Sequence, residues 1–209
     1  MPTIINIEKE KLIPNHSETA RYLGYSKINS PEEEIVALIE NASKMAKDVI
    51  TAKAIYECFD LEIESSNQGD QLPIIKLKNT NVQIESKDLY NNLYNCKKVY
   101  LLACTLGPQM DLLIRKTQIT DSVFAAILQA TGAMYIEEVV DFVNNQIKEM
   151  EIQNGNFTKP RFSPGFGDVS LEVQKDFFSL LPCSKIGLTL MDTLIMAPEK
   201  SVTAFVGIY

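Results

Sequence analysis

The sequence contains no tryptophan and only one histidine, His16, among its 209 residues. A single imidazole nearly excludes a histidine-rich metal site and a Ser-His-Asp triad. The four cysteines are widely scattered, at Cys58, Cys96, Cys104 and Cys183. That spacing fits neither a zinc motif nor a disulfide framework, so we expect reduced, buried thiols and a cytoplasmic protein. We predict no metal site and no catalytic residue.

The chain also lacks a basic excess and a long apolar run. It carries 20 Lys and Arg against 27 Asp and Glu, a formal charge of −7, with no basic cluster. Nucleic-acid binding depends on clustered positive charge, so a nucleic-acid partner is not expected. No apolar stretch approaches the roughly 20 residues needed to span a bilayer, and Met1–Pro14 mixes charges too freely for a signal peptide. We therefore expect no membrane partner.

The length of the chain allows one large domain with a buried core or two small domains. The sequence shows no internal repeat, no low-complexity segment and no linker that demands a boundary. We therefore predict a single domain over residues 1–209.

Hydrophobic periodicity predicts the order of the helices and strands. Helices are predicted at Asn15–Tyr25, from Ser30-Pro31-Glu32-Glu33 to Val49, and at Ser86–Asn95, Met110–Lys116, Thr120–Glu149 and Asp168–Leu181. Strands are predicted at Thr3–Ile7, Ala52–Glu64, Leu72–Leu77, Asn81–Ile84, Lys98–Thr105, Lys185–Leu190 and Ser201–Ile208, with a turn over 65–71. Without regular βαβ alternation or a glycine-rich phosphate loop, this order predicts an α+β fold.

The run Pro160-Arg161-Phe162-Ser163-Pro164-Gly165-Phe166-Gly167-Asp168 is the most informative stretch. Its prolines and glycines forbid a helix or a central strand and predict a loop of fixed shape. Arg161 offers a planar fork that suits a carboxylate, and Phe166 offers a flat apolar face. Asp168 is a plausible N-cap for Leu171–Leu181. The residues alone leave two interpretations open: a rigid connection whose aromatics plug the core, or a binding loop.

Four blocks in the last third of the chain resemble one family. They are the run from Arg161 to Asp168, then Leu171–Lys175, Ile186–Leu190 and Met196–Thr203. Their order and spacing resemble the S-adenosylmethionine-binding activation (reactivation) domain of cobalamin-dependent methionine synthase, in a free-standing form. Arg21–Tyr25 and Thr105–Gly107 are also similar to short members of that family. The resemblance implies helices packed around a twisted, mainly antiparallel sheet in one curved domain.

The resemblance also implies a set of site residues. Arg161 matches the arginine that pairs with the methionyl carboxylate of S-adenosylmethionine. Ser163, followed by Gly165, matches a position whose backbone meets the adenine. Phe166 matches a tyrosine at the mouth that faces cobalamin, without its hydroxyl. The family's Asp-Trp-Thr-Pro run has no counterpart here, and neither does its C-terminal extension.

An acidic group on the predicted Thr120–Glu149 helix is a further candidate. Glu137 and Asp141 are four residues apart and share a face, which Glu138 flanks. The residues alone favour a solvated helix face over a binding group. In the family a glutamate in the middle of a helix contacts S-adenosylmethionine, and Glu137 or Glu138 is the nearest match.

The function that the resemblance implies is support of reductive methylation. An electron from a reductase or flavodoxin and a methyl group from S-adenosylmethionine would restore methylcobalamin from inactive Co(II). The cobalamin would arrive on a partner, a methionine synthase or related corrinoid protein, and this chain would cap its exposed face. Two alternatives remain: a non-catalytic module that docks on a corrinoid protein, and a small-molecule sensor that keeps only the pocket.

Overall fold

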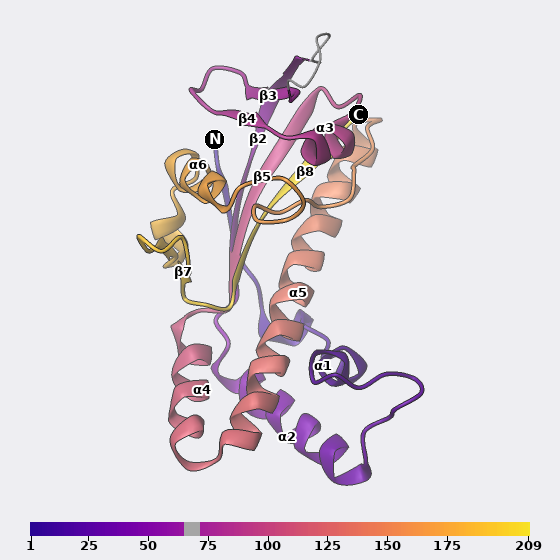
Figure 1. The fold of residues 1–209 in the computed structure, drawn as a ribbon, viewed down its shortest axis with the longest axis vertical. Coiled ribbons are helices and arrows are strands. Elements are labelled where there is room, and N and C mark those ends of the chain that lie inside the picture. Colours follow the sequence, from indigo (N-terminus) through magenta and orange to yellow (C-terminus); the bar gives the residue numbers. More distant parts are fainter. Residues whose placement is uncertain (65–71) are drawn as a thin grey trace.

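The computed structural model describes residues 1–64 and 72–209 (Figure 1). Its strands are β1 (Thr3–Asn6), β2 (Lys53–Glu64), β3 (Ile74–Leu77), β4 (Gln83–Glu85), β5 (Lys98–Thr105), β6 (Thr189–Leu190), β7 (Met196–Ala197) and β8 (Ser201–Ile208). Its α-helices are α1 (His16–Tyr22), α2 (Glu33–Val49), α3 (Lys87–Leu93), α4 (Pro108–Thr120), α5 (Ser122–Gln153) and α6 (Gln174–Leu180). Short 3-10 helices cover Lys9–Lys11, Leu171–Val173 and Cys183–Ile186. The turn predicted over 65–71 lies outside the described residues.

The main sheet has the strand order β4-β3-β2-β5-β8, and β1 pairs separately with β2. Every strand pairing among the described residues is antiparallel. β5 lies between β2 and β8, and all of its residues except Lys98 are buried. The strand predicted at Lys98–Thr105 is thus confirmed, and its nearly continuous apolar run fits a central strand that is covered on both faces. The predicted α+β class with an antiparallel sheet is confirmed as well.

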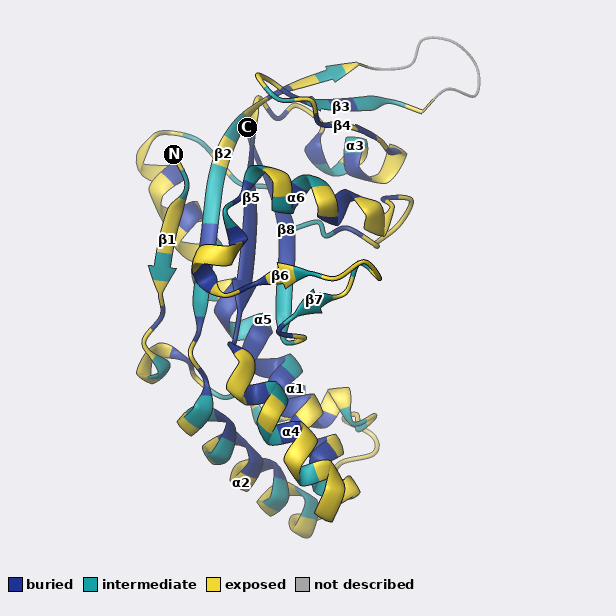
Figure 2. Cartoon of the chain, turned by 90° about the vertical axis from the view of Figure 1, so that its left-hand side faces the viewer, coloured by how far each residue is buried: buried dark blue, intermediate teal, exposed yellow. Residues whose placement is uncertain are grey.

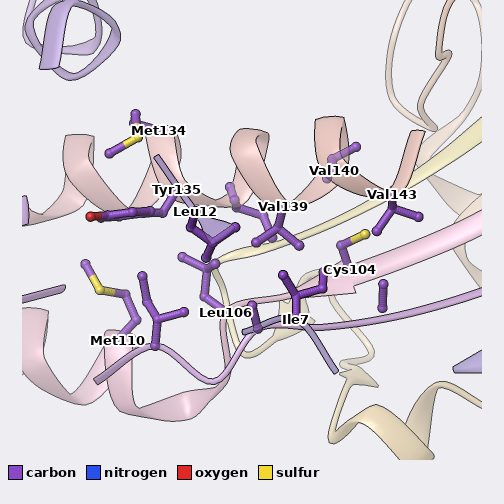
Figure 3. Packing of buried hydrophobic residues seen from close by; sticks show 14 of the residues in the cluster. Ile7, Leu12, Cys104, Leu106, Met110, Met134, Tyr135, Val139, Val140 and Val143 are labelled. Atoms are coloured by element: carbon purple, nitrogen blue, oxygen red, sulfur yellow. The ribbon is translucent and has the colours of Figure 1, made fainter. Parts of the chain in front are cut away.

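Each face of the sheet buries its own apolar cluster. On one face, Leu102 and Cys104 of β5 pack with the apolar stripe of α5. Figure 3 shows this cluster, with Val139 and Val143 of α5 among its members. On the other face, Leu101 of β5 packs with α3, α6 and the residues that follow α6. The alternation along β5 puts neighbouring side chains into different clusters, as the period of two requires.

Helix α5 is the longest helix and runs along the sheet into a separate helical end. There α1, α2 and α4 pack around its first half (Figures 1 and 2). By length and composition α5 could cross a membrane, although 61% of its most apolar window is buried in the protein. This corrects the expectation that no stretch approaches that length. Burial of this kind is typical of a core helix.

Several predicted boundaries are wrong. α2 begins at Glu33 with Glu32 as its N-cap, so the helix starts three residues after Ser30. α4 extends to Thr120, well beyond the predicted end at Lys116. The helix predicted at Ser86–Asn95 ends at Leu93, and Tyr94 after it is 53% exposed. Of the predicted strand Lys185–Leu190, Lys185 and Ile186 end a 3-10 helix, and only Thr189–Leu190 pairs, with Met196–Ala197.

Candidate ligand-binding pocket

The segment before the proline-rich loop extends the sheet beyond β8. Phe157 and Tyr209 exchange both backbone hydrogen bonds, at 2.9 and 3.0 Å. Phe162 and Phe205 do the same, at 3.0 and 2.7 Å. Phe162 also packs against the apolar cluster on the α6 side of the sheet. Arg161 is therefore held between two anchored points, directly before the chain leaves the sheet.

The loop is fastened at its far end by Asp168, which has a role that the sequence did not predict. Its carboxylate accepts hydrogen bonds from the hydroxyl of Ser86, from Lys87 N at 2.8 Å and from Asp88 N at 3.2 Å. Asp168 N in turn donates to Asp88 Oδ2 at 3.1 Å. Asp168 therefore caps α3. The prediction that it caps the following helix is wrong, because Ser170 accepts from Glu172 N there.

Arg161 joins the loop to α5 through two carboxylates. Its Nη2 donates to Asp141 Oδ1 at 2.8 Å and to Glu137 Oε2 at 3.2 Å. The Arg161 side chain is 24% exposed, while those of Glu137 and Asp141 are 43% and 56% exposed. The predicted shared face of Glu137 and Asp141 is thus present, and it is turned toward Arg161. The three charges form a half-buried group with one net negative charge at neutral pH.

This charged group lies at a cavity of about 670 Å³ between α5, the loop and β8. The cavity is large enough for a nucleoside-sized ligand. Four of the predicted site residues line it together: Glu137, Arg161, Ser163 and Phe166. Pro160, Phe162, Pro164, Met196, Ser201 and Val202 supply further wall. Phe166 is 68% exposed, so an aromatic face stands at the rim.

Glu138 and Gly165 are not among the residues that line this cavity. Burial, and secondarily the charge of Asp141, raise the pKa of the Glu138 carboxyl. Gly165 shapes the loop instead, since its N–H donates to Val169 O at 3.0 Å. Of the two candidate glutamates, Glu137 is the one that lines the pocket. The binding roles of all these residues stay predictions.

Sequence reasoning missed four polar residues of the pocket: Asn144 on α5, Gln174 on α6, and Ser201 and Thr203 on β8. Thr203 and Gln174 are both buried, and the threonine hydroxyl donates to Gln174 Oε1 at 2.9 Å. Both lie inside the blocks that carry the family resemblance. Their place in these blocks could have identified them as candidates, although nothing in the local sequence indicates that the two side chains contact each other.

Other features of the described residues offer less chemistry. A cavity of about 480 Å³ lies at the helical end, lined by residues of α1, the loop after it and the start of α2. None of the predicted site residues reaches that cavity. No group of three or more His, Cys, Asp or Glu side chains that could hold a metal ion occurs in residues 1–64 and 72–209.

Comparison with known proteins finds similarity in structure and none in sequence. No protein-family model matches the chain, and no curated protein matches it by sequence. Among solved structures, the chain is similar to the MetH reactivation domain bound to AdoHcy (S-adenosylhomocysteine), with a TM-score of 0.70. The match covers 99% of this chain and 78% of that chain at 15% sequence identity. The chain therefore has the fold of that reactivation domain.

Proposed function

We propose that this protein is a stand-alone activation subunit that binds S-adenosylmethionine and supports reductive methylation of cob(II)alamin. The cobalamin is carried by a methionine synthase or related corrinoid protein, and a flavodoxin-type reductant supplies the electron. The observation that carries the proposal is the meeting of Arg161 and Glu137 at one cavity, within the fold of a domain whose solved structure holds AdoHcy.

The charges at the cavity suit the amino-acid end of S-adenosylmethionine. A guanidinium binds a carboxylate through two parallel N–H···O bonds, which Arg161 can provide. A carboxylate such as Glu137 accepts hydrogen bonds from an ammonium group, so together they recognise a zwitterion. Because the loop is fastened to β8 and to α3, little backbone entropy is lost on binding.

The role of the chain is binding and orientation. Arg161 and Glu137 would hold S-adenosylmethionine, whose sulfonium would supply the methyl group. The cobalamin on the partner would supply the metal that is reduced by one electron and methylated, and S-adenosylhomocysteine would be the other product. Phe166, exposed at the rim, offers a flat apolar contact for the partner that brings the cobalamin. The chain itself offers the pocket and that rim.

The first test is a calorimetric titration of the purified protein with S-adenosylmethionine, beside the Arg161→Ala variant. We expect saturable binding to the wild type and a clear loss in the variant. The second test adds cobalamin-loaded synthase and reduced flavodoxin, and follows methylcobalamin by its absorbance. Formation that depends on this chain supports the activation role, and no dependence overturns it.

The two alternative functions predict other outcomes of the same tests. Capture of the corrinoid protein without S-adenosylmethionine binding would indicate a docking module. Binding of S-adenosylmethionine without any effect on cobalamin, and without capture of the corrinoid protein, would indicate a sensor.

A further inference from the structure

The edge of β8 is open where it borders the pocket. Phe205 exchanges both backbone hydrogen bonds with Phe162, so odd-numbered residues of β8 turn their backbone groups away from β5. Thr203, two residues earlier, directs its N–H and C=O the same way. Neither group has a hydrogen-bond partner among the described residues, although Thr203 is 2% exposed. A buried residue thus presents an unused donor and acceptor to the cavity.

Pro164 explains why this edge is open. If the pairing of Phe162 with Phe205 continued in antiparallel register, Pro164 would lie opposite Thr203. Proline has no N–H to donate to the Thr203 carbonyl, so the ladder cannot extend by another hydrogen-bonded pair. The chain instead turns, with Phe166 N donating to Ser163 O at 3.2 Å. A gap remains between Pro164 and Thr203, and both residues line the cavity.

The Gln174 side chain adds a second unused donor beside Thr203. Its Oε1 accepts from the threonine hydroxyl at 2.9 Å, and its Nε2 has no partner among the described residues. Gln174 is only 4% exposed and lines the cavity. A ligand that fills the cavity would cover this donor, and burying an amide N–H without a partner is costly, so the position favours a ligand that accepts from it.

The opposite wall contributes a further acceptor. Oδ1 of Asn144, on α5, is buried without a hydrogen-bond partner in the described part of the chain. Between these polar groups the wall is apolar and includes Phe162, Met196 and Val202. The pocket therefore suits a flat, largely apolar group that carries hydrogen-bond donors and acceptors around its rim. A purine base has that character.

We propose that Thr203 and Gln174 hold the edge of an adenine base. The Thr203 N–H donates to a ring nitrogen, its C=O accepts from the neighbouring exocyclic amino group, and Gln174 Nε2 donates to a second ring nitrogen. Gln174 and Thr203 then select the base, while Arg161 and Glu137 select the amino-acid end. This inference rests on the proposed function and adds to it the determinants of base specificity.

The probes that test it lack the amino-acid end: 5′-methylthioadenosine and 5′-methylthioinosine. The inosine compound replaces the amino donor by an oxo acceptor and the adjacent ring acceptor by an N–H, which reverses both groups facing Thr203. We expect it to bind at least about ten-fold more weakly, as for the loss of one or two hydrogen bonds with their partners left unpaired. Gln174→Met should lower the affinity for 5′-methylthioadenosine by about ten-fold. Gln129→Met, at an exposed position of α5, is the control and should change nothing.

Amide hydrogen exchange of the wild-type protein tests the backbone contact without any variant. In the free protein the Thr203 N–H should exchange much faster than that of Phe205, which is bonded to Phe162. Saturation with 5′-methylthioadenosine should slow exchange at Thr203. If Gln174→Met does not fold, Gln174→Glu keeps the acceptor for Thr203 and removes the donor, and should weaken binding similarly.

The outcomes separate this inference from the proposed function. Tight binding of S-adenosylmethionine with no preference for adenine over hypoxanthine, and no slowing at Thr203, overturns the inference and leaves the function intact. The inference is also overturned, with the function intact, if removal of the ribose 2′-hydroxyl abolishes binding and the change of base does not. Adenine-selective binding that S-adenosylmethionine does not improve supports the inference and counts against the function. Failure of every probe to bind overturns both.

Discussion

Arg161 and Asp141 are joined through one nitrogen, Nη2 of the guanidinium, which lies 2.8 Å from Oδ1 of Asp141. The same nitrogen donates to Glu137 at 3.2 Å. A bidentate carboxylate needs Nη2 together with either Nη1 or Nε, because the third edge of the guanidinium is blocked by its own side chain. In the free protein, Asp141 and Glu137 already accept from Nη2, the nitrogen that a ligand carboxylate would require. Binding must exchange one carboxylate partner for another.

Removing Arg161 should affect the ligand far more than the fold. Arg161→Ala should lower S-adenosylmethionine affinity by about 1.5–3 kcal/mol, the range for a hydrogen bond to a charged group. Arg161→Lys should also weaken binding, because it keeps the charge and loses the fork. The free energy of unfolding should change by less than about 1 kcal/mol, since both carboxylate partners are roughly half exposed. Calorimetry and a thermal melt on the same samples measure both. Unchanged affinity with a large loss of stability would make Arg161 a structural residue.

Removing the competing charge should strengthen binding. Asp141→Asn removes the ion pair with Nη2 of Arg161, so a ligand carboxylate has a weaker interaction to displace. We expect S-adenosylmethionine to bind about 2–5-fold more tightly, the free-energy range of an exposed ion pair. 5′-Methylthioadenosine, which has no carboxylate, should bind unchanged and is the matched control. Equal gains for both ligands would indicate a general charge effect and not competition for Arg161.

The sequence was informative where one element determines its own structure. The buried run of β5 and the apolar stripe of α5 define these elements without reference to the rest of the chain. The shared face of Glu137 and Asp141 follows from helical spacing alone. The loop around Arg161 was recognisable because its prolines and glycines exclude regular structure.

What could not be predicted depends on contacts between distant segments. Asp168 follows the local rule for an N-cap, yet its carboxylate accepts from backbone N–H groups of α3, some 80 residues earlier. The pairing of Thr203 with Gln174 likewise joins a strand to a helix, and a buried polar pair has no periodic signature. The open strand edge beside Thr203 could be predicted only if the pairing of Phe162 with Phe205, which brings Pro164 opposite Thr203, were already known. Each of these is set by tertiary register.

The C-terminal end of α5 is secured by a buried carboxylate, which gives a stability prediction. Glu151 accepts from Tyr100 OH at 2.6 Å and from Asn156 Nδ2 at 2.7 Å. Burial and the bond to Glu151 raise the pKa of Tyr100. Tyr100→Phe should lower the free energy of unfolding by about 1–3 kcal/mol, since a buried acceptor loses its partner. Urea unfolding measures this. Tyr94→Phe is the control, because Tyr94 is exposed and its side chain makes no hydrogen bond within residues 1–64 and 72–209; an equal effect there would refute the interpretation.

The Asp168 cap should make stability depend on pH. The hydrogen bond from Ser86, followed by those from the Lys87 and Asp88 amides, lowers the pKa of Asp168 below the usual 3.8. A carboxyl whose pKa is lower in the folded state contributes its stability above the unfolded value and loses it as pH falls through the folded value. Wild type should therefore lose stability relative to Asp168→Asn as pH falls below about 4. Thermal melts at pH 6 and pH 3 provide the comparison. A constant difference between the two proteins would mean that the carboxylate does not stabilise the cap.

The contact between Asp168 and the start of α3 also leaves no room for a side chain at Gly167. Its φ is +54°, and an added Cβ would lie 2.2 Å from Asp88 Oδ2, the atom that accepts from Asp168 N. Gly155 also has a positive φ, +80°, but a Cβ there meets nothing within 4 Å. Gly155→Ala should therefore cost only the left-handed backbone penalty of about 1–2 kcal/mol. Gly167→Ala should cost more, and should also weaken S-adenosylmethionine binding because the loop that carries Arg161 loses its attachment to α3. Urea unfolding and calorimetry on the two variants make the comparison. Equal costs, with ligand affinity unchanged in both, would show that the contact between the loop and α3 does not position the pocket.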